Sequence, residues 1–448
     1  MTKKLLALIS VVIIATLLLA ACGTPATQAP AATEAPAAAT EAPVATAAAT
    51  EAAAPVTITW WHITTKDPGL TEFQKMADDY MAAHPNVIIE ITVLENEAFK
   101  TKLTTVMQSG EVPDIFQSWG QGGMIEQVNA GLLKDISADL KGEWGDSLGA
   151  LDAFAVDGKN YGVPWDMGAV TFWYNKDLFE KAGITAVPTT WSEFLADCET
   201  LKKAGITPIS VGEGDKWPGM HIWAYLVSRI GGAEAFSAAA ATGAARTGSF
   251  NDPAFVQAGY ELKKLVDGGY FQEGFLGATH DQMNATFGNG EAAMELGGQW
   301  SPSVEKANSA DGVGVKNMGM FNFPAVEGGA GKVTDIVGGG NGFAIGKNAP
   351  PEAIDFVKYL TNLDNQKIVA ATGMGIPVAK GAAASIADPN MVMVADAVAN
   401  STYYQLYFDQ VLPSAMGSII NDAVQKIFAG TATPEEVCAE IEAGFLAQ

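Results

Sequence analysis

Short runs of β-branched residues alternate along the chain with longer segments of helical periodicity. Residues 56–61 (VTITWW) alternate as a strand does, residues 69–83 place apolar side chains at helical spacing, and residues 86–94 predict a second strand. Strand, helix, strand predicts a parallel sheet with crossover helices, so the expected fold class is α/β. The same series continues with a helix expected at 99–109, a strand at 114–117 and a helix at 124–130.

A second series of strands and helices begins near residue 160. Thr190 precedes the apolar pattern of residues 191–204, and Glu193 lies in its first turn, which predicts a capped helix start. The remaining elements expected in this half are a strand at 169–174 and helices at 176–182 and 350–360.

The N-terminal segment has a different composition. Lys3 and Lys4 precede an apolar stretch that is too short for a permanent membrane span, so residues 1–21 are predicted to be a signal peptide. The stretch ends in Leu-Ala-Ala-Cys-Gly around Cys22, which resembles the lipobox of bacterial lipoproteins. Residues 22–55 are almost wholly Ala, Thr, Pro and Glu, which predicts a disordered tether behind a lipidated Cys22. The folded part is then expected outside the cytoplasm, anchored to the membrane through this lipid.

Charge and cysteine content exclude several classes of protein. The 448 residues carry 26 Lys and Arg against 50 Asp and Glu, a formal net charge of -24, which disfavours nucleic acid as a partner. Three cysteines form neither a disulfide framework nor a zinc motif, and whether Cys198 and Cys438 pair is left open. The phosphate-loop and dinucleotide glycine patterns are absent, so no cofactor and no metal are expected.

Several segments, in order, resemble the extracytoplasmic solute-binding proteins of carbohydrate ABC importers, the maltose-binding-protein-like family 1. The most specific is VPWDMGAVTFWYNKDLFEKAGI, followed by PTTWSEFLADCETLKKAGITPI, FGNGEAAMELGGQW and FPAVEGGAGKVTDIVGGGNGFAIGKN. The resemblance implies a two-lobed periplasmic-binding-protein fold of type II, each lobe a mixed sheet flanked by helices, with a ligand cleft at the hinge. It implies an N-lobe of residues 56–164 and 322–364 and a C-lobe of 165–321 and 365–448.

A sugar presents apolar C–H faces and hydroxyl edges, so its site needs aromatic platforms and planar polar side chains. Residues at predicted strand ends and in mixed glycine-flanked loops meet this need, and the family resemblance implies Asp166 at the hinge and a stacking aromatic at Trp300. Only one of Trp60 and Trp61 is expected to face the cleft, and which of Tyr403, Tyr404 and Tyr407 does so is left open. The expected ligand-binding residues are Trp61, His62, Trp119, Gln121, Asp166, Asp215, Lys216, Trp217, His221, Trp300, Gly339, Gly340, Asn341, Tyr404 and Tyr407.

The expected function is capture of a neutral sugar, of the xylo-oligosaccharide or raffinose type, by hinge closure in a monomer, and its delivery to the permease subunits of an ABC importer. No enzymatic activity is expected, because no motif marks out a catalytic pair among the 50 acidic residues. Two alternatives stay open: the same fold binding a non-sugar solute such as ferric iron through the adjacent Tyr403 and Tyr404, and a secreted glycosidase. Arg229 and Arg246 are the chain's only arginines, which disfavours phosphate or carboxylate ligands.

Overall fold

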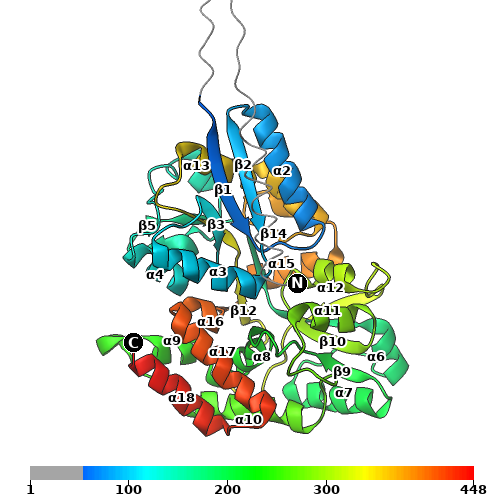
Figure 1. The fold of residues 1–448 in the computed structure, drawn as a ribbon. Coiled ribbons are helices and arrows are strands. Elements are labelled where there is room, and N and C mark those ends of the chain that lie inside the picture. The colour runs from blue at the N-terminus through cyan, green and yellow to red at the C-terminus, as the bar shows by residue number, and fades with distance from the viewer. Residues whose placement is uncertain (1–53) are drawn as a thin grey trace, which may run out of the picture. The chain divides into compact units, whose positions relative to one another are not determined.

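The computed structural model describes residues 54–448, and their strands form three main sheets (Figure 1). The predicted leader, Cys22 and nearly all of the predicted tether lie outside the described residues. The first sheet has the order β2-β1-β3-β13-β6, with β1 parallel to both of its neighbours and β13 antiparallel to β3 and β6. Its strands are β1 (Val56–His62), β2 (Val87–Val93), β3 (Ile115–Ser118), β13 (Gly342–Ile345) and β6 (Gly162–Pro164).

The second and third sheets have four strands each. The order β11-β8-β10-β9 defines the sheet of the C-lobe, and the order β14-β7-β12-β15 defines a sheet at the crossings between the lobes, called the hinge sheet below. The strands of the second sheet are β8 (Thr171–Asn175), β9 (Thr207–Ser210), β10 (Ala292–Gly297) and β11 (Met318–Phe321). The hinge sheet contains β7 (Asp166–Ala169), β12 (Ile336–Gly339), β14 (Ile376–Pro377) and β15 (Tyr404–Leu406), and β4 (Ala155–Val156) pairs with β5 (Lys159–Asn160) in a small hairpin.

Helices cover the two lobe sheets, and their sequence signals explain their bounds. Thr190 and Glu193 form a capping box at the predicted start of α7. The α-helices are α2 (Gly69–Ala83), α3 (Asn96–Ser109), α4 (Gln121–Asn129), α5 (Glu143–Ser147), α6 (Lys176–Ala182), α7 (Trp191–Lys203), α8 (Trp217–Gly231), α9 (Ala235–Ala240), α10 (Pro253–Asp267), α11 (His280–Gly288), α12 (Ser301–Asn308), α13 (Pro351–Leu360), α14 (Leu363–Thr372), α15 (Pro389–Ala399), α16 (Phe408–Val411), α17 (Ser414–Ala429) and α18 (Pro434–Leu446).

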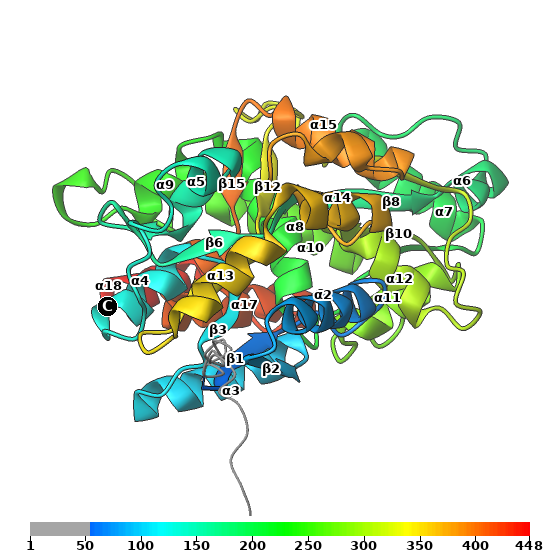
Figure 2. The ribbon, with the colours of Figure 1, turned by 90° about the horizontal axis from the view of Figure 1, so that it is seen from above.

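Segments far apart in the chain complete each core. Helices α2 and α13 lie side by side beside the first sheet (Figure 2), and the Tyr80 hydroxyl of α2 donates a hydrogen bond of 2.9 Å to Asp355 of α13. Helix α8 is buried along most of its length in the core of the C-lobe. Its Arg229 guanidinium donates to the carbonyl oxygens of Phe323 and Asp335 and so ties α8 to the segment between β11 and β12.

Core packing favours other crossing points between the lobes than those expected from the family resemblance. Phe323 packs in the core of the C-lobe, whereas Val369 and Ala382 pack in the core of the N-lobe. Packing therefore keeps the connection after β11 in the C-lobe and keeps α14 in the N-lobe. We propose an N-lobe of residues 56–164 and 342–382 and a C-lobe of residues 170–335 and 404–448, joined by the hinge sheet.

Candidate functional site

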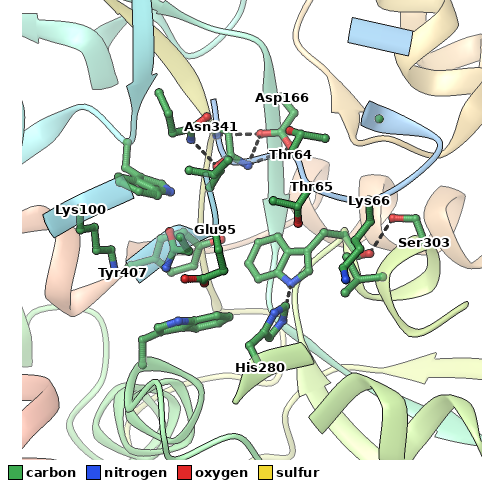
Figure 3. A pocket seen from close by; sticks show the side chains of 18 of the residues that line it. Thr64, Thr65, Lys66, Glu95, Lys100, Asp166, His280, Ser303, Asn341 and Tyr407 are labelled. Carbon is green, nitrogen blue, oxygen red and sulfur yellow. Dashed lines mark hydrogen bonds between the residues drawn. The ribbon is translucent and has the colours of Figure 1, made fainter. Parts of the chain in front are cut away.

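A cavity opens between the two lobes at the carboxyl ends of β1 and β3, where ligands bind in open α/β sheets. Its volume is about 200 Å³, and it opens to solvent at its mouth. Residues of both lobes and of the hinge sheet line the cavity, so a ligand bound there would touch all three. Figure 3 shows its lining from close by.

The C-lobe wall is an aromatic cluster at the N-terminal ends of α8, α11, α12 and α16. The rings of Trp217 and His280 lie 4.7 Å apart, His221 stacks on Tyr407 at 5.1 Å, and Trp217 meets Trp300 edge-on at 6.2 Å. Trp217 and His221 share a face of α8 because they are four residues apart. We call Trp217, His221, His280, Trp300 and Tyr407 the aromatic wall.

Hydrogen bonds fix the orientation of His280 within this wall. The indole N–H of Trp300 donates to His280 Nε2 at 3.3 Å (Figure 3), and the His280 backbone N–H donates to Asp215 Oδ2 at 2.6 Å. Burial lowers the pKa of His280 to about 4, so its ring is neutral at neutral pH and Nε2 can accept. Burial also lowers the pKa of His221, to about 3. The wall therefore offers uncharged ring faces to a ligand.

The N-lobe wall is more polar. Its lining comes from the loop after β1, the first turn of α3 and the end of β3, including Glu95, Lys100 and Trp119. The Lys100 ammonium pairs with Glu97 at 2.9 Å and lies 5.7 Å from the centre of the Trp119 ring. Trp119 is thus an aromatic side chain on the opposite side of the cavity from the aromatic wall.

Asp166 organises a hydrogen-bond network at the hinge (Figure 3). Asp166 Oδ1 accepts from the Asn341 backbone N–H at 2.7 Å, and Asp166 Oδ2 accepts from Gln299 Nε2 at 2.9 Å. The Asn341 amide also donates to Asp166 and accepts from Gln117 Nε2 at 2.8 Å. Burial raises the pKa of Asp166 to about 6, and the hydrogen bonds offset only part of that effect. The network links β3, the hinge and the end of β10, and it displays amide groups to the cavity.

One ion pair crosses the mouth of the cavity. Lys66 follows β1 in the N-lobe and Asp281 lies in the first turn of α11 in the C-lobe, and their charged groups lie 2.9 Å apart. Both side chains are partly exposed, so solvent screens the pair. The contact shows that the two lobes touch in this structure.

Seven of the residues predicted from the sequence line the cavity, namely Trp119, Asp166, Trp217, His221, Trp300, Asn341 and Tyr407. The other predicted residues lie elsewhere, and packing explains each case.

Neither Trp60 nor Trp61 lines the cavity, contrary to the expectation that one of them would. β1 pairs on both edges near its end, and helices cover both faces of the sheet at that point. Trp60 is buried against Phe73, and Trp61 packs under Lys102, whose ammonium lies 4.3 Å from the ring. His62 is also buried, and burial lowers its pKa to about 4.

Gln121, Asp215 and Lys216 likewise do not line the cavity. Gln121 begins α4 and its amide donates to the Ala153 carbonyl oxygen at 3.5 Å. Lys216 pairs with Asp422 on α17. Asp215 lies behind the cavity lining, where its carboxylate accepts a hydrogen bond from the backbone N–H of His280. Burial raises the pKa of Asp215.

Gly339, Gly340 and Tyr404 support the hinge rather than the cavity surface. A Cβ atom at Gly339 would lie 2.4 Å from the Tyr407 ring, and one at Gly340 would lie 2.6 Å from the Asp166 carbonyl oxygen. The Tyr404 hydroxyl donates to the carbonyl oxygens of Gly168 and Gly339. The glycines therefore allow close packing of strands, and of the three tyrosines at 403, 404 and 407 it is Tyr407 that reaches the cavity.

Several residues that line the cavity, in the loop after β1 and at helix starts, were not predicted from the sequence. One signal was available: Thr279 and Gln282 form a capping box that places His280 at the first turn of α11, beside the cavity. Thr64, Thr65 and Lys66 carry no such pattern. The missed residues include Thr64, Thr65, Lys66, Glu95, Asn96, Lys100, Gln117, Trp165, His280, Asp281, Ser303, Asp409 and Gln410.

Three further findings concern residues 54–448. No group of three or more His, Cys, Asp or Glu side chains in this range is arranged to hold a metal ion. None of the helices in the same range is long and apolar enough to cross a membrane. Cys198 and Cys438 are both buried free thiols, which answers the question of whether they pair.

Two lobes around a hinge sheet, with a cavity lined from both sides, define a two-lobed solute-binding protein. The family model of the bacterial extracellular solute-binding protein matches residues 67–367, and the chain belongs to this family of binding proteins.

The chain is also similar to individual binding proteins. A solved structure from work on xylan utilization by the thermophilic bacterium Caldanaerobius polysaccharolyticus has a TM-score of 0.81 and 32% identity, covering 87% of this chain and 99% of that chain. A chitin oligosaccharide binding protein has a TM-score of 0.80 and 29% identity, covering 88% and 98%. The multiple sugar-binding protein of Streptococcus mutans is 26% identical over 304 residues, 64% of this chain and 67% of that protein. With other curated relatives the match spans about half, 53%, of their length.

Proposed function

We propose that the chain captures a neutral oligosaccharide outside the cell by closure of its two lobes and delivers it to the permease subunits of an ABC importer. The observation that carries the proposal is the aromatic wall of the C-lobe, which faces an amide network at the hinge and Trp119 on the N-lobe. Aromatic faces pack on sugar C–H groups, and amides both donate to and accept from hydroxyls. Each lobe supplies part of the contacts, so a bound ligand favours the closed arrangement.

The charges around the cavity support a ligand without anionic groups. Arg246 pairs with Glu442 at 2.6 Å, and Arg229 is satisfied by backbone carbonyl oxygens in the C-lobe core. Both arginines are thus engaged away from the cavity. The lysines of the lining, Lys66 and Lys100, are themselves paired with carboxylates.

Ferric iron is the weaker alternative. Such a site would need tyrosine hydroxyls free to coordinate the metal, but the Tyr404 hydroxyl is directed at two carbonyl oxygens and the Tyr403 hydroxyl at Gln405. We therefore favour the sugar over a metal ligand.

An enzymatic role has little support. Among the carboxylates that line the cavity, Asp166 has the pKa that burial raises most. Its oxygens already accept hydrogen bonds from two amide side chains and a backbone N–H, so Asp166 is not free to act as an acid or a nucleophile. One G-x-S-x-G pattern does occur, at residues 145–149. Its Ser147 ends the short helix α5 and donates to the Trp144 carbonyl oxygen, which is not the strand-to-helix elbow that activates such a serine.

The names of similar proteins guide the choice of sugar. The structure from work on xylan utilization and the chitin oligosaccharide binding protein are both about 30% identical to this chain over almost their full length. We propose a β-linked oligosaccharide of the xylo-oligosaccharide type, with raffinose-type sugars as the second candidate.

Calorimetry with a panel of xylo-, chito-, cello-, malto- and raffinose-type oligosaccharides tests the function. We expect tight binding of at least one of them and no release of reducing sugar during a long incubation. Binding of none, or turnover of any, would overturn the proposal.

We also propose that Cys22 carries the lipid that anchors the chain to the outer face of the membrane and that the protein is a monomer. Labelling with an alkyne fatty acid should mark the native chain and not a Cys22→Ser variant. A labelled Cys22→Ser variant would refute the anchor. Sedimentation of the purified protein measures its oligomeric state.

A further inference from the structure

Helix α4 of the N-lobe touches the start of α17 in the C-lobe, apart from the ion pair at the cavity mouth (Figure 1). Gly122 lies in the first turn of α4 and is buried. A Cβ atom at this position would lie 2.1 Å from both the carbonyl carbon and the carbonyl oxygen of Leu412, and 2.7 Å from the Pro413 nitrogen. These are backbone atoms of the other lobe, and they cannot rotate away as a side chain can.

The conformation of Gly122 itself does not require glycine. It lies within α4, and its φ is outside the left-handed region. Alanine is the better helix former, so the N-lobe alone would tolerate or favour alanine here. The requirement for glycine therefore comes from the contact between the lobes.

A hydrogen bond beside Gly122 joins the same two helices. Glu126, one turn further along α4, accepts from the Ser414 backbone N–H at 3.1 Å and from the Ser414 hydroxyl at 2.6 Å. The N-cap residue of α17 is Pro413, whose side chain cannot cap. The carboxylate of one lobe thus satisfies a free N–H at the helix start of the other, where negative charge is favourable.

We infer that Gly122 and Glu126 are positioning residues for ligand capture. Gly122 leaves the space that lets α4 close onto the Leu412–Ser414 turn, and Glu126 holds the closed arrangement by capping α17. This inference rests on the proposed function, because closure serves the binding of the ligand. Neither residue lines the cavity, so any effect on binding must act through the equilibrium between open and closed lobes.

The neighbouring Gly123 provides a matched control. A Cβ atom there would lie 3.6 Å from the Ser414 hydroxyl oxygen, an ordinary contact distance. Gly122→Ala and Gly123→Ala therefore make the same chemical change in the same helix, and only the first inserts a methyl group into the backbone of the other lobe.

A disulfide test needs no ligand. In a Gly123→Cys/Ser414→Cys variant of the full chain, the two sulfur atoms can meet only when the lobes touch as they do here. We expect this pair to cross-link under mild oxidation, and we expect addition of Gly122→Ala to slow the reaction about tenfold or more. Single-cysteine variants control for Cys22, Cys198 and Cys438. A pair that does not cross-link, or one that cross-links equally fast with Gly122→Ala, overturns the inference.

A binding test uses xylotriose as the probe in the full chain. Gly122→Ala should weaken binding about tenfold or more, while Gly123→Ala stays within about twofold of the wild type. Glu126→Ala should weaken binding by about two- to fivefold, and Glu126→Gln, which keeps an acceptor oxygen, should restore most of it. Thermal melting identifies any variant that does not fold, and the exposed Glu126 variants keep the test decisive if Gly122→Ala is one of them.

The two tests separate the inference from the proposed function. If no oligosaccharide binds the wild type, the proposed function fails while the cross-linking result still decides the role of Gly122. Equal affinities of Gly122→Ala and Gly123→Ala for xylotriose, with both folded, would overturn the inference and leave the proposed function standing.

Discussion

Glu295 is a buried acid on β10 of the C-lobe sheet, and replacing it should change how stability depends on pH. It lies on β10 between Trp173 of β8 and Ser210 of β9, and its side chain is fully buried. Burial, together with repulsion from Glu305, raises its pKa from 4.5 to about 8, and the Ser301 hydroxyl offsets only part of this effect. The native protein therefore favours the protonated form of Glu295.

The sign of the effect follows from this direction. A carboxyl whose pKa is higher in the folded than in the unfolded state contributes stability below pH 4.5, and this contribution is lost as pH rises through about 8. The full loss amounts to about 5 kcal/mol, and about 4 kcal/mol of it falls between pH 5 and 8.5. For a folded unit of about 400 residues, 4 kcal/mol corresponds to about 5 °C in Tm.

Glu295→Gln keeps the shape of the side chain and removes the titration. The effect of the new amide on packing is constant with pH, so the informative quantity is the change in the Tm difference between variant and wild type. We expect Glu295→Gln to gain about 5 °C on the wild type between pH 5 and 8.5, measured by calorimetry without ligand.

Two variants calibrate this measurement. Glu305→Gln should show a smaller gain over a lower range, since burial raises the pKa of Glu305 only to about 7. Glu291→Gln removes an exposed charge and should follow the wild type. Parallel Tm curves of wild type and Glu295→Gln across this range would show that the Glu295 carboxyl is not held protonated, and the reasoning would be wrong.

Three further predictions concern the cavity. Trp300→Ala should weaken binding of the oligosaccharide found by the panel about tenfold or more, with little change in Tm, because the half-buried ring lines the cavity; unchanged affinity would remove Trp300 from the site. His280→Phe should weaken binding about three- to tenfold at pH 7, since the Trp300 indole N–H loses its acceptor, whereas His280→Gln should lose less; equal losses would argue against the hydrogen bond. Lys66→Gln and Asp281→Asn should each weaken binding about twofold in 50 mM salt and less in 500 mM salt, because the pair is partly exposed; an effect independent of salt would exclude an electrostatic role.

Part of the helices and strands could be predicted from local sequence patterns. The helix predicted at 69–83 is α2, and the helix start predicted at Thr190 is the start of α7. These signals are local, because a helix start and an apolar stripe involve residues within a few turns of each other.

The cavity could be predicted only where a residue type and a strand end coincide. Trp119 met both conditions and lines the cavity, whereas Trp61 met both and is covered by Lys102. The difference between the two residues comes from the strands that pair with β1 and the helices that pack on it. A local sequence pattern does not predict such long-range packing. The contact of Lys66 with Asp281 depends on how two lobes meet, and neither residue carries a local signal for it.

The uneven distribution of rings between the lobes sets an order of events for ligand binding. Trp217, His221, His280, Trp300 and Tyr407 belong to one lobe and hold one another in place without the other. A ligand can therefore stack on the preformed aromatic wall while the cleft is open, and the association rate should depend on the residues of the C-lobe. The N-lobe contacts the ligand only when the lobes close, and these contacts must break before the ligand can leave. The residues of the N-lobe should therefore govern the dissociation rate.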